Sequence, residues 1–250
     1  PSDESYDNED RKSLHYLHNW QINDQFSTNL EYNYASDKDY FADLDNNPNS
    51  KTDLNLRRAW EVNYKNGIPG LKAQFKVEDF QTLDPTVLDE DRPYARLPQL
   101  LVNYKTGNPL GLQLEFNNDT AYFQKDLRNF ADIPQNDNKI YQPSGTRIYN
   151  DFSVRYNHYN PWSFFIPEAS VRNINTFYDE KTRDRGGSSE SQSIVVPQFT
   201  LDTGLIFEKE GTYLQTLTPR LFYAYSPYEN QQNQPNFDSV VASINYDQLF

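Results

Sequence analysis

The chain has 250 residues and a formal net charge of −13, with 36% hydrophobic and 15% aromatic residues. This aromatic content excludes a disordered chain, and the acidic balance argues against a nucleic-acid binder, which needs a basic face. No run of about 18 apolar residues is present, which excludes a membrane-spanning helix. The absence of Cys excludes disulfides and thiolate chemistry.

Apolar and polar residues alternate with a period of two along the chain, beginning at Leu14, Tyr16 and His18. This period is typical of β-strands that have one apolar and one polar face. No segment of comparable length shows the 3.6-residue period of a helix. The pattern predicts about eleven strands, at 11–22, 25–35, 52–64, 70–81, 94–104, 110–124, 146–157, 162–178, 193–208, 212–226 and 239–250.

The connections between these strands alternate in length. The short ones carry Gly, Asn, Asp or Pro, which suit tight turns, and lie near 23–24, 66–67, 107–108, 160–161 and 210–211. The long ones cover about 36–51, 82–93, 125–145, 179–192 and 227–238. Long strands joined in this way are typical of an antiparallel, up-and-down transmembrane β-barrel with periplasmic turns and extracellular loops. The alternative is a soluble sandwich or two-layer sheet with one wet face.

Aromatic residues are expected to form two girdles, one at each end of the strands. Beside short turns stand Trp20, Tyr64, Tyr104, Tyr156, Tyr159, Trp162 and Tyr213, and beside long loops stand Tyr34, Tyr94, Tyr122, Tyr178 and Tyr225. Four prolines interrupt the predicted strands: Pro98, Pro167, Pro197 and Pro219. Because proline cannot donate to a ladder, we expect bulges or weakly paired positions there or, alternatively, strands that end at other residues.

Residues with catalytic or metal-binding potential are few. His15 and His18 would point to opposite faces of one strand, and no phosphate-binding loop or hydrolase motif is present. The stretch 43–47 has the carboxylates of a calcium loop but lacks its Gly and closing Glu. Acidic clusters at 3–10, 37–45 and 84–91 are expected to be solvated or, alternatively, to hold divalent cations beside anionic lipid. Charged residues predicted to line a hydrated lumen are Glu31, Glu61, Lys72, Lys76 and Glu115. We therefore expect no cofactor.

The last forty residues contain four short motifs: Gln-Thr-Leu-x-Pro-Arg, Tyr-x-Tyr-x-Pro-Tyr, Phe-Asp-Ser and a final Leu-Phe. Together they resemble the LPS-assembly protein LptD family, also called organic solvent tolerance proteins, of Gram-negative bacteria. Two further stretches, 97–100 and 196–199, are similar to strand openings of that family. The residues that carry the resemblance, as structural motif positions, are Gln215, Leu217, Pro219, Arg220, Tyr223, Tyr225, Pro227, Phe237, Asp238, Leu249 and Phe250.

The resemblance implies a barrel of about 26 strands, preceded by a periplasmic jelly-roll, in the cell outer membrane. Residues 1–250 would then be one partial barrel domain without the jelly-roll or the final strands, and the absence of Met agrees with a segment of a longer protein. The implied function is translocation of lipopolysaccharide (LPS) into the outer leaflet. The implied partners are the plug lipoprotein LptE and, through the jelly-roll, the periplasmic bridge protein LptA.

Two other functions compete with this expectation. One is an outer-membrane porin or substrate-specific channel, which would have the same strand pattern but would need no lipoprotein plug. The other is a barrel enzyme such as a lipase or protease. That enzyme would need a catalytic set at one rim, and only His158 lies outside the first predicted strand. We therefore expect a protein that is not an enzyme.

Overall fold

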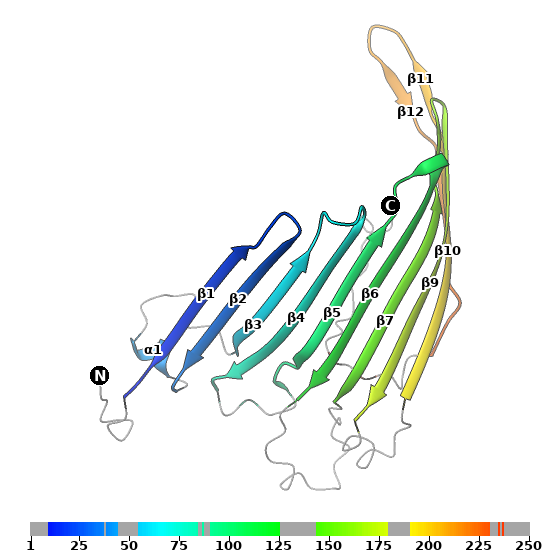
Figure 1. Ribbon diagram of the computed structural model, residues 1–250. Helices are drawn as coiled ribbons and strands as arrows, with labels where there is room; N and C mark the ends of the chain where they lie inside the picture. The colour runs from blue at the N-terminus through cyan, green and yellow to red at the C-terminus, as the bar shows by residue number, and fades with distance from the viewer. Residues whose placement is uncertain are drawn as a thin grey trace.

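The computed structural model describes residues 10–37, 39–44, 55–84, 87, 91–125, 144–179, 191–230, 235 and 237. An 11-stranded antiparallel sheet dominates these residues and runs in the order β1-β2-β3-β4-β5-β6-β7-β9-β10-β13, with β8 paired to β9. Apart from β8 and the two strands β11 and β12, strands adjacent in the sheet are adjacent in the chain, so the topology is up-and-down (Figure 1). The strands are β1 Ser13–Gln21, β2 Phe26–Ala35, β3 Asn55–Tyr64, β4 Leu71–Thr82, β5 Ala95–Lys105, β6 Leu112–Gln124, β7 Gly145–Tyr156, β8 His158–Asn160, β9 Ser163–Tyr178, β10 Ser191–Leu205 and β13 Arg220–Tyr225.

The predicted strands agree with the structure to within about three residues up to β10. The prediction of a single strand over 212–226 is wrong, because this segment divides into β12 (Gln215–Leu217) and β13. β12 pairs with β11 (Phe207–Lys209) in a separate two-stranded sheet, which projects beyond the main sheet in Figure 1. The predicted strand at 239–250 lies outside the described residues.

The register gives the sheet two chemically different faces. On one face, which we call the apolar face, Val62 lies opposite Thr28 on β2 and Phe75 on β4, and Phe75 lies opposite Leu100. On the other, which we call the polar face, a row runs across β2–β5 through Asn29, Glu61, Lys76 and Gln99. Since successive side chains of a strand alternate between faces, this pairing confirms the predicted alternation.

Large side chains of the apolar face remain exposed within the described residues. Trp60 and Phe152 are each 46% exposed, and Leu14 is 52% exposed. A soluble protein rarely leaves so wide an apolar surface in water, so this face belongs against hydrocarbon or another apolar surface. The buried side chains of the described residues are instead few, and the largest of them lie on the polar face near the long connections.

The four prolines agree with the prediction only in part: Pro98 lies at a register shift, Pro167 and Pro197 keep regular pairs between β9 and β10, and Pro219 lies outside any strand. The register shifts on both sides of Pro98, between Arg96 and Gln99 on β5 and opposite them on β4. Pro167 lies in the gap between the β7 and β8 pairings of β9. Pro197 precedes the first β13 pair at Phe199, and Pro219 lies between β12 and β13.

Tight turns and long connections lie at opposite ends of the sheet. The turns between β1 and β2 and between β3 and β4 lie at the upper edge in Figure 1, and the connections after β2, β4, β6 and β9 begin at the lower edge. Asn66 in the second turn has a positive φ of 62°, a conformation that Asn tolerates. A short helix, α1 (Tyr40–Leu44), follows β2. No helix of the described residues has the length and apolar character needed to cross a membrane.

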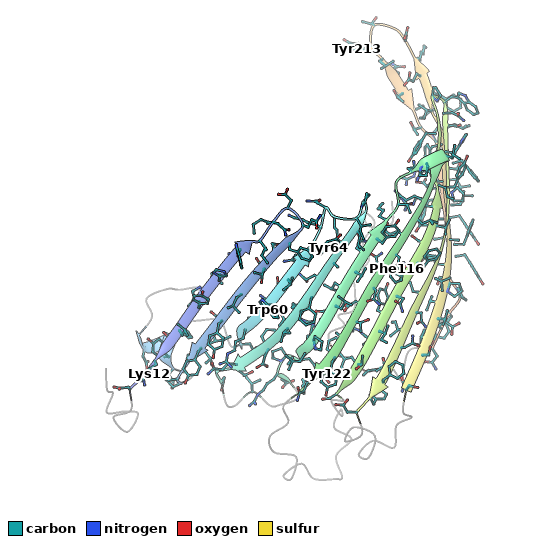
Figure 2. All side chains as sticks on the ribbon, viewed as in Figure 1. Lys12, Trp60, Tyr64, Phe116, Tyr122 and Tyr213 are labelled. Carbon is teal, nitrogen blue, oxygen red and sulfur yellow. The ribbon has the colours of Figure 1, made fainter. Side chains whose placement is uncertain are left out.

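The aromatic residues partly form the two predicted girdles. Tyr64 lies near the upper edge and Tyr122 near the lower edge in Figure 2, and Trp20, Trp162 and Tyr34 are exposed at strand ends. Two members are placed differently from the prediction. Tyr94 is only 6% exposed and lies in a cluster on the polar face, because Phe237 and Phe123 cover it. Tyr225 pairs with Phe199 in the middle of β10. It does not reach the edge of the sheet, because β13 starts opposite Gly204 and ends after six residues.

Candidate functional site

The polar face is the candidate functional site, and its centre is a network of charged side chains on β2, β3, β4 and β5. Arg57 of β3 binds Glu31 of β2, Glu61 of its own strand and Glu78 of β4, each at 2.7 Å. Glu78 also binds Lys76 at 3.1 Å and Arg96 of β5. Since the Glu78 side chain is only 5% exposed, these cations are needed to compensate its desolvation.

A second series of ion pairs continues the network across β5–β13. Each pair joins neighbouring strands at polar-face positions, and most of the basic members are close to half exposed. The pairs are Lys105–Glu115, Arg147–Asp119, Arg155–Glu168, Arg172–Asp151 and Arg220–Asp202. The predicted lumen residues Glu31, Glu61, Lys76 and Glu115 thus all belong to ion pairs.

Basic and acidic side chains occur on this face in nearly equal number, although the whole chain carries −13. The acidic excess therefore lies elsewhere, in agreement with the clusters found in the sequence at 3–10, 37–45 and 84–91. A wall of matched charges is hydrated and has little net attraction for ions of either sign. A charged side chain without an oppositely charged partner on this face would therefore create a local positive or negative potential around itself.

A trough of about 650 Å³ lies on the polar face, near the short turns. Two rows of polar side chains line it. Ser27, Asn63 and Gln74 follow one another across β2–β4, and Lys72, Asn103 and Asn117 follow one another across β4–β6. Lys65, which follows β3, Tyr149 of β7 and apolar residues such as Leu101 also line it.

The motif residues at 215–227 form the junction between the hairpin and the main sheet. Gln215 pairs with Lys209 and Leu217 with Phe207 in the hairpin. The carbonyl of Pro219 then accepts a hydrogen bond from the Leu205 amide of β10 at 3.0 Å. Gly204 is required beside it, because a Cβ there would lie 2.9 Å from the Pro219 oxygen.

Arg220 continues the junction into the polar face. Its Nε and Nη2 donate to the two carboxylate oxygens of Asp202 at 2.7 and 2.8 Å. Such a two-pronged contact fixes the geometry as well as the charge. Tyr223 and Tyr225 lie opposite Leu201 and Phe199 on the apolar face. Pro227 follows the end of β13.

Phe237 brings the described end of the chain onto the polar face, beside β5 and β6. Its ring stacks on Phe123 at 4.5 Å and meets Tyr94 edge-on at 5.3 Å. The guanidinium groups of Arg96 and Arg147 lie 5.8 and 4.7 Å from the Phe123 ring. Sequence reasoning missed this cluster because its members are far apart in the chain. The other late motif residues, Asp238, Leu249 and Phe250, lie outside the described residues.

The structure offers no obvious catalytic or metal centre in the part of the chain that it describes. His15 contacts Asn33 on the polar face, and His18 lies opposite Leu30 on the apolar face. His158 contacts Asn160 and Tyr156 beside β9. Among the described residues, no group of three or more His, Asp and Glu side chains is arranged to hold a metal ion.

A separate charged cluster lies at the long-connection end of β1 and β2. Arg11 donates to Asp37 at 2.7 and 3.0 Å and to Asp43 of α1 at 3.0 Å, and its side chain is 2% exposed. Partial burial of the Asp37 carboxyl opposes its ionisation. The hydrogen bonds from Arg11 and Ser36 outweigh that effect and hold the pKa of Asp37 below its usual value.

The comparisons with known proteins agree on one family. The LptD family, described as LPS transport system D, matches residues 9–250. The LPS-assembly protein LptD of Acinetobacter baumannii is 68% identical over the whole chain and 30% of its own length. That of Acinetobacter baylyi is 65% identical over the same shares, and that of Psychrobacter cryohalolentis is 38% identical over the whole chain and 26% of its own length. The chain spans less than a third of the length of these curated relatives.

Proposed function

The chain belongs to the LptD family, whose place is the outer membrane of Gram-negative bacteria, and we propose from this premise that it is a barrel-wall segment of an LPS translocon. The full protein would transfer LPS from the periplasm into the outer leaflet. In this proposal residues 1–250 form one partial barrel domain of about eleven strands, and a jelly-roll and further strands belong to the rest of the protein.

The observation that carries the proposal is the two-faced sheet. Its apolar face can meet hydrocarbon, and its polar face is hydrated and lined by matched charges, so a saccharide could move along it. Backbone groups in lipid must all be paired, which an antiparallel sheet achieves only when it closes into a barrel. The described sheet is open, with β1 and β13 at its edges, and so further strands are needed to close it.

The proposed partners follow from the same premise. A lipoprotein such as LptE would fill the barrel lumen and contact the polar face, and LptA would deliver LPS to the periplasmic domain. No step of this transfer requires bond chemistry, so the protein would act as a conduit and not as an enzyme. Divalent cations would matter only where they bridge LPS phosphates and loop carboxylates.

Depletion of the full-length protein tests the function. Cells that lose it should accumulate newly made LPS in the periplasm and inner membrane, and surface LPS measured with an impermeant probe should fall. Cells that carry the full-length protein but lack the plug lipoprotein should show the same defect. Normal surface LPS under depletion, together with slower uptake of small solutes, would favour the porin alternative.

A further inference from the structure

The trough on the polar face contains two lysines whose charges the described residues do not match. Lys72 is the second residue of β4 and Lys65 follows β3, and both are exposed. Neither Nζ lies within 4.0 Å of a carboxylate in the described part of the chain. This sets them apart from Lys76 and Lys105 on the same face, which bind Glu78 and Glu115.

Two carboxylates of β6 on this face, one of which (Asp119) lines the trough, are already occupied by other cations and amides. Glu115 binds Lys105 at 3.3 Å and accepts from Asn117. Asp119 accepts from Gln99 at 2.8 Å and lies 3.6 Å from Arg147. Placed beside these satisfied groups, Lys72 and Lys65 give the trough a local positive charge in a chain that is acidic overall.

The rest of the lining combines amide side chains with apolar groups such as Leu101 and Tyr64, and the amides suit a saccharide. Amide side chains both donate and accept hydrogen bonds, as sugar hydroxyls do, and the two rows supply Asn63, Gln74, Asn103 and Asn117. Gln74 donates to Asn63 at 2.8 Å and Asn103 donates to Asn117 at 2.5 Å, so the amides are already oriented. Tyr149 adds an aromatic ring at the far side of the trough.

We infer that the trough binds a phosphorylated saccharide, with Lys72 and Lys65 on the phosphate and the amide rows on the sugar hydroxyls. Lysine is a compact cation that binds phosphate as a point charge. This inference rests on the proposed function, because it assigns the trough to the phosphorylated sugar portion of a glycolipid that passes along the polar face. The trough lies near the short turns, so the contact would be made early if transfer starts from that side.

Photocrosslinking tests the inference in the full-length protein in cells. A benzoylphenylalanine at Asn103, directly opposite Lys72, should crosslink to phosphorylated glycolipid. The double variant Lys65→Gln, Lys72→Gln should lower that yield by about tenfold. Lys65→Arg, Lys72→Arg should restore it, because the charge is kept. The control is Lys209→Gln, at the end of β11 in the separate hairpin and outside the trough lining, and it should leave the yield near that of the unaltered protein.

A second arm uses the purified full-length protein and LPS with or without phosphatase treatment. Untreated LPS should crosslink at Asn103, and the treated form should crosslink about tenfold less. Inorganic phosphate should compete only weakly if the saccharide contributes to binding. Equal yields from both forms of LPS, strong competition by free phosphate, or crosslinks only to an acidic protein would each overturn the inference.

The proposed function can fail separately. Ser153 lies on the polar face of β7, between Glu115 and Ser170 and away from the trough lining. If a probe at Ser153 crosslinks to glycolipid while the double Gln variant changes nothing at Asn103, only the trough assignment is wrong. If neither probe captures glycolipid from a folded protein, the proposed function is wrong as well.

Discussion

Arg57 joins three strands through its guanidinium group. Its partners Glu31, Glu61 and Glu78 come from β2, β3 and β4, and the three 2.7 Å contacts use all three nitrogens. A Lys at this position could not reproduce that fork, because its charge is a single point. The residue therefore fixes both the register and the charge balance of this part of the polar face.

Replacement of Arg57 by Met should destabilise the full-length protein by about 1–3 kcal/mol. Breaking a buried ion pair costs about 3–5 kcal/mol, but Arg57 is 34% exposed and water would relieve part of the loss. The measurement is the unfolding midpoint in urea, with heat-modifiable mobility as the sign of folded barrel. The control is Arg172→Met, because its pair with Asp151 is more exposed and longer, at 3.4 Å. A larger effect at Arg172 than at Arg57 would contradict the network.

The Arg11–Asp37 contact should make stability depend on pH at the long-connection rim. The pKa of Asp37 is lower in the folded protein than in the unfolded chain, so the unfolded state binds the proton more readily. The stabilisation is therefore present above the usual carboxyl pKa and is lost as pH falls through the lower, folded value. At neutral pH we expect about 1–2 kcal/mol from this contact.

The variant Asp37→Asn isolates this effect. Unfolding midpoints of the full-length protein and the variant should differ at pH 7 and converge in acid, when Asp37 is protonated. Asp24, an exposed residue in the turn between β1 and β2, gives the control Asp24→Asn, whose unfolding midpoint should stay close to that of the unaltered protein at pH 7. A constant difference between Asp37→Asn and the unaltered protein at all pH values would mean that the carboxylate charge is not involved.

At the scale of the strand, the two faces should respond differently to the same charge. Leu114 of β6 lies opposite Val154 on the apolar face, and Ser153 of β7 lies opposite Glu115 on the polar face. An Arg at a lipid-facing site near the membrane centre costs about 2–4 kcal/mol. Leu114→Arg should therefore lower stability by that amount in a folding titration in lipid, and Ser153→Arg should change it little. Equal losses would show that the faces are assigned wrongly.

Alternation was enough to predict the strands and their faces, because register follows from period two once one face is apolar. It failed at 212–226, where the structure has two short strands in place of one. The break between them depends on the hydrogen bond from the Leu205 amide of β10 to the Pro219 carbonyl. The sequence predicted that charged residues line a hydrated face, but it did not predict which of them form ion pairs. Which acidic residue meets which basic residue depends on the register between strands. Neither the Phe237 cluster nor the trough could be predicted, because each joins segments distant in sequence.

At the scale of the whole molecule, the open edges of the sheet limit what this segment can do alone. β1 pairs only with β2, and β13 pairs only with β10, within the described residues. Each unpaired edge group in lipid costs several kcal/mol. Residues 1–250 expressed alone should therefore aggregate or survive only in detergent. Their recovery from outer membranes as a heat-modifiable monomer would show instead that the segment closes by itself.

The orientation of the barrel in the membrane can be measured at the two ends of one strand. Short turns of such barrels face the periplasm and long loops face the outside, so the two ends of β5 should lie on opposite sides of the membrane. Asp91 is exposed in the long connection before β5, and Gly107 lies in the short connection after it. A Cβ at Gly107 would meet only Pro109, at 4.0 Å, so the site tolerates a side chain.

In the full-length protein, which must first be checked for other Cys residues, Asp91→Cys should react with an impermeant maleimide on intact cells. Gly107→Cys should react only after the outer membrane is opened, because β5 has 11 residues and spans about 36 Å along its axis. That length, even when tilted, exceeds the apolar band of about 25 Å. The reverse order of labelling would invert the barrel, and equal labelling of both sites on intact cells would mean that β5 does not cross the membrane.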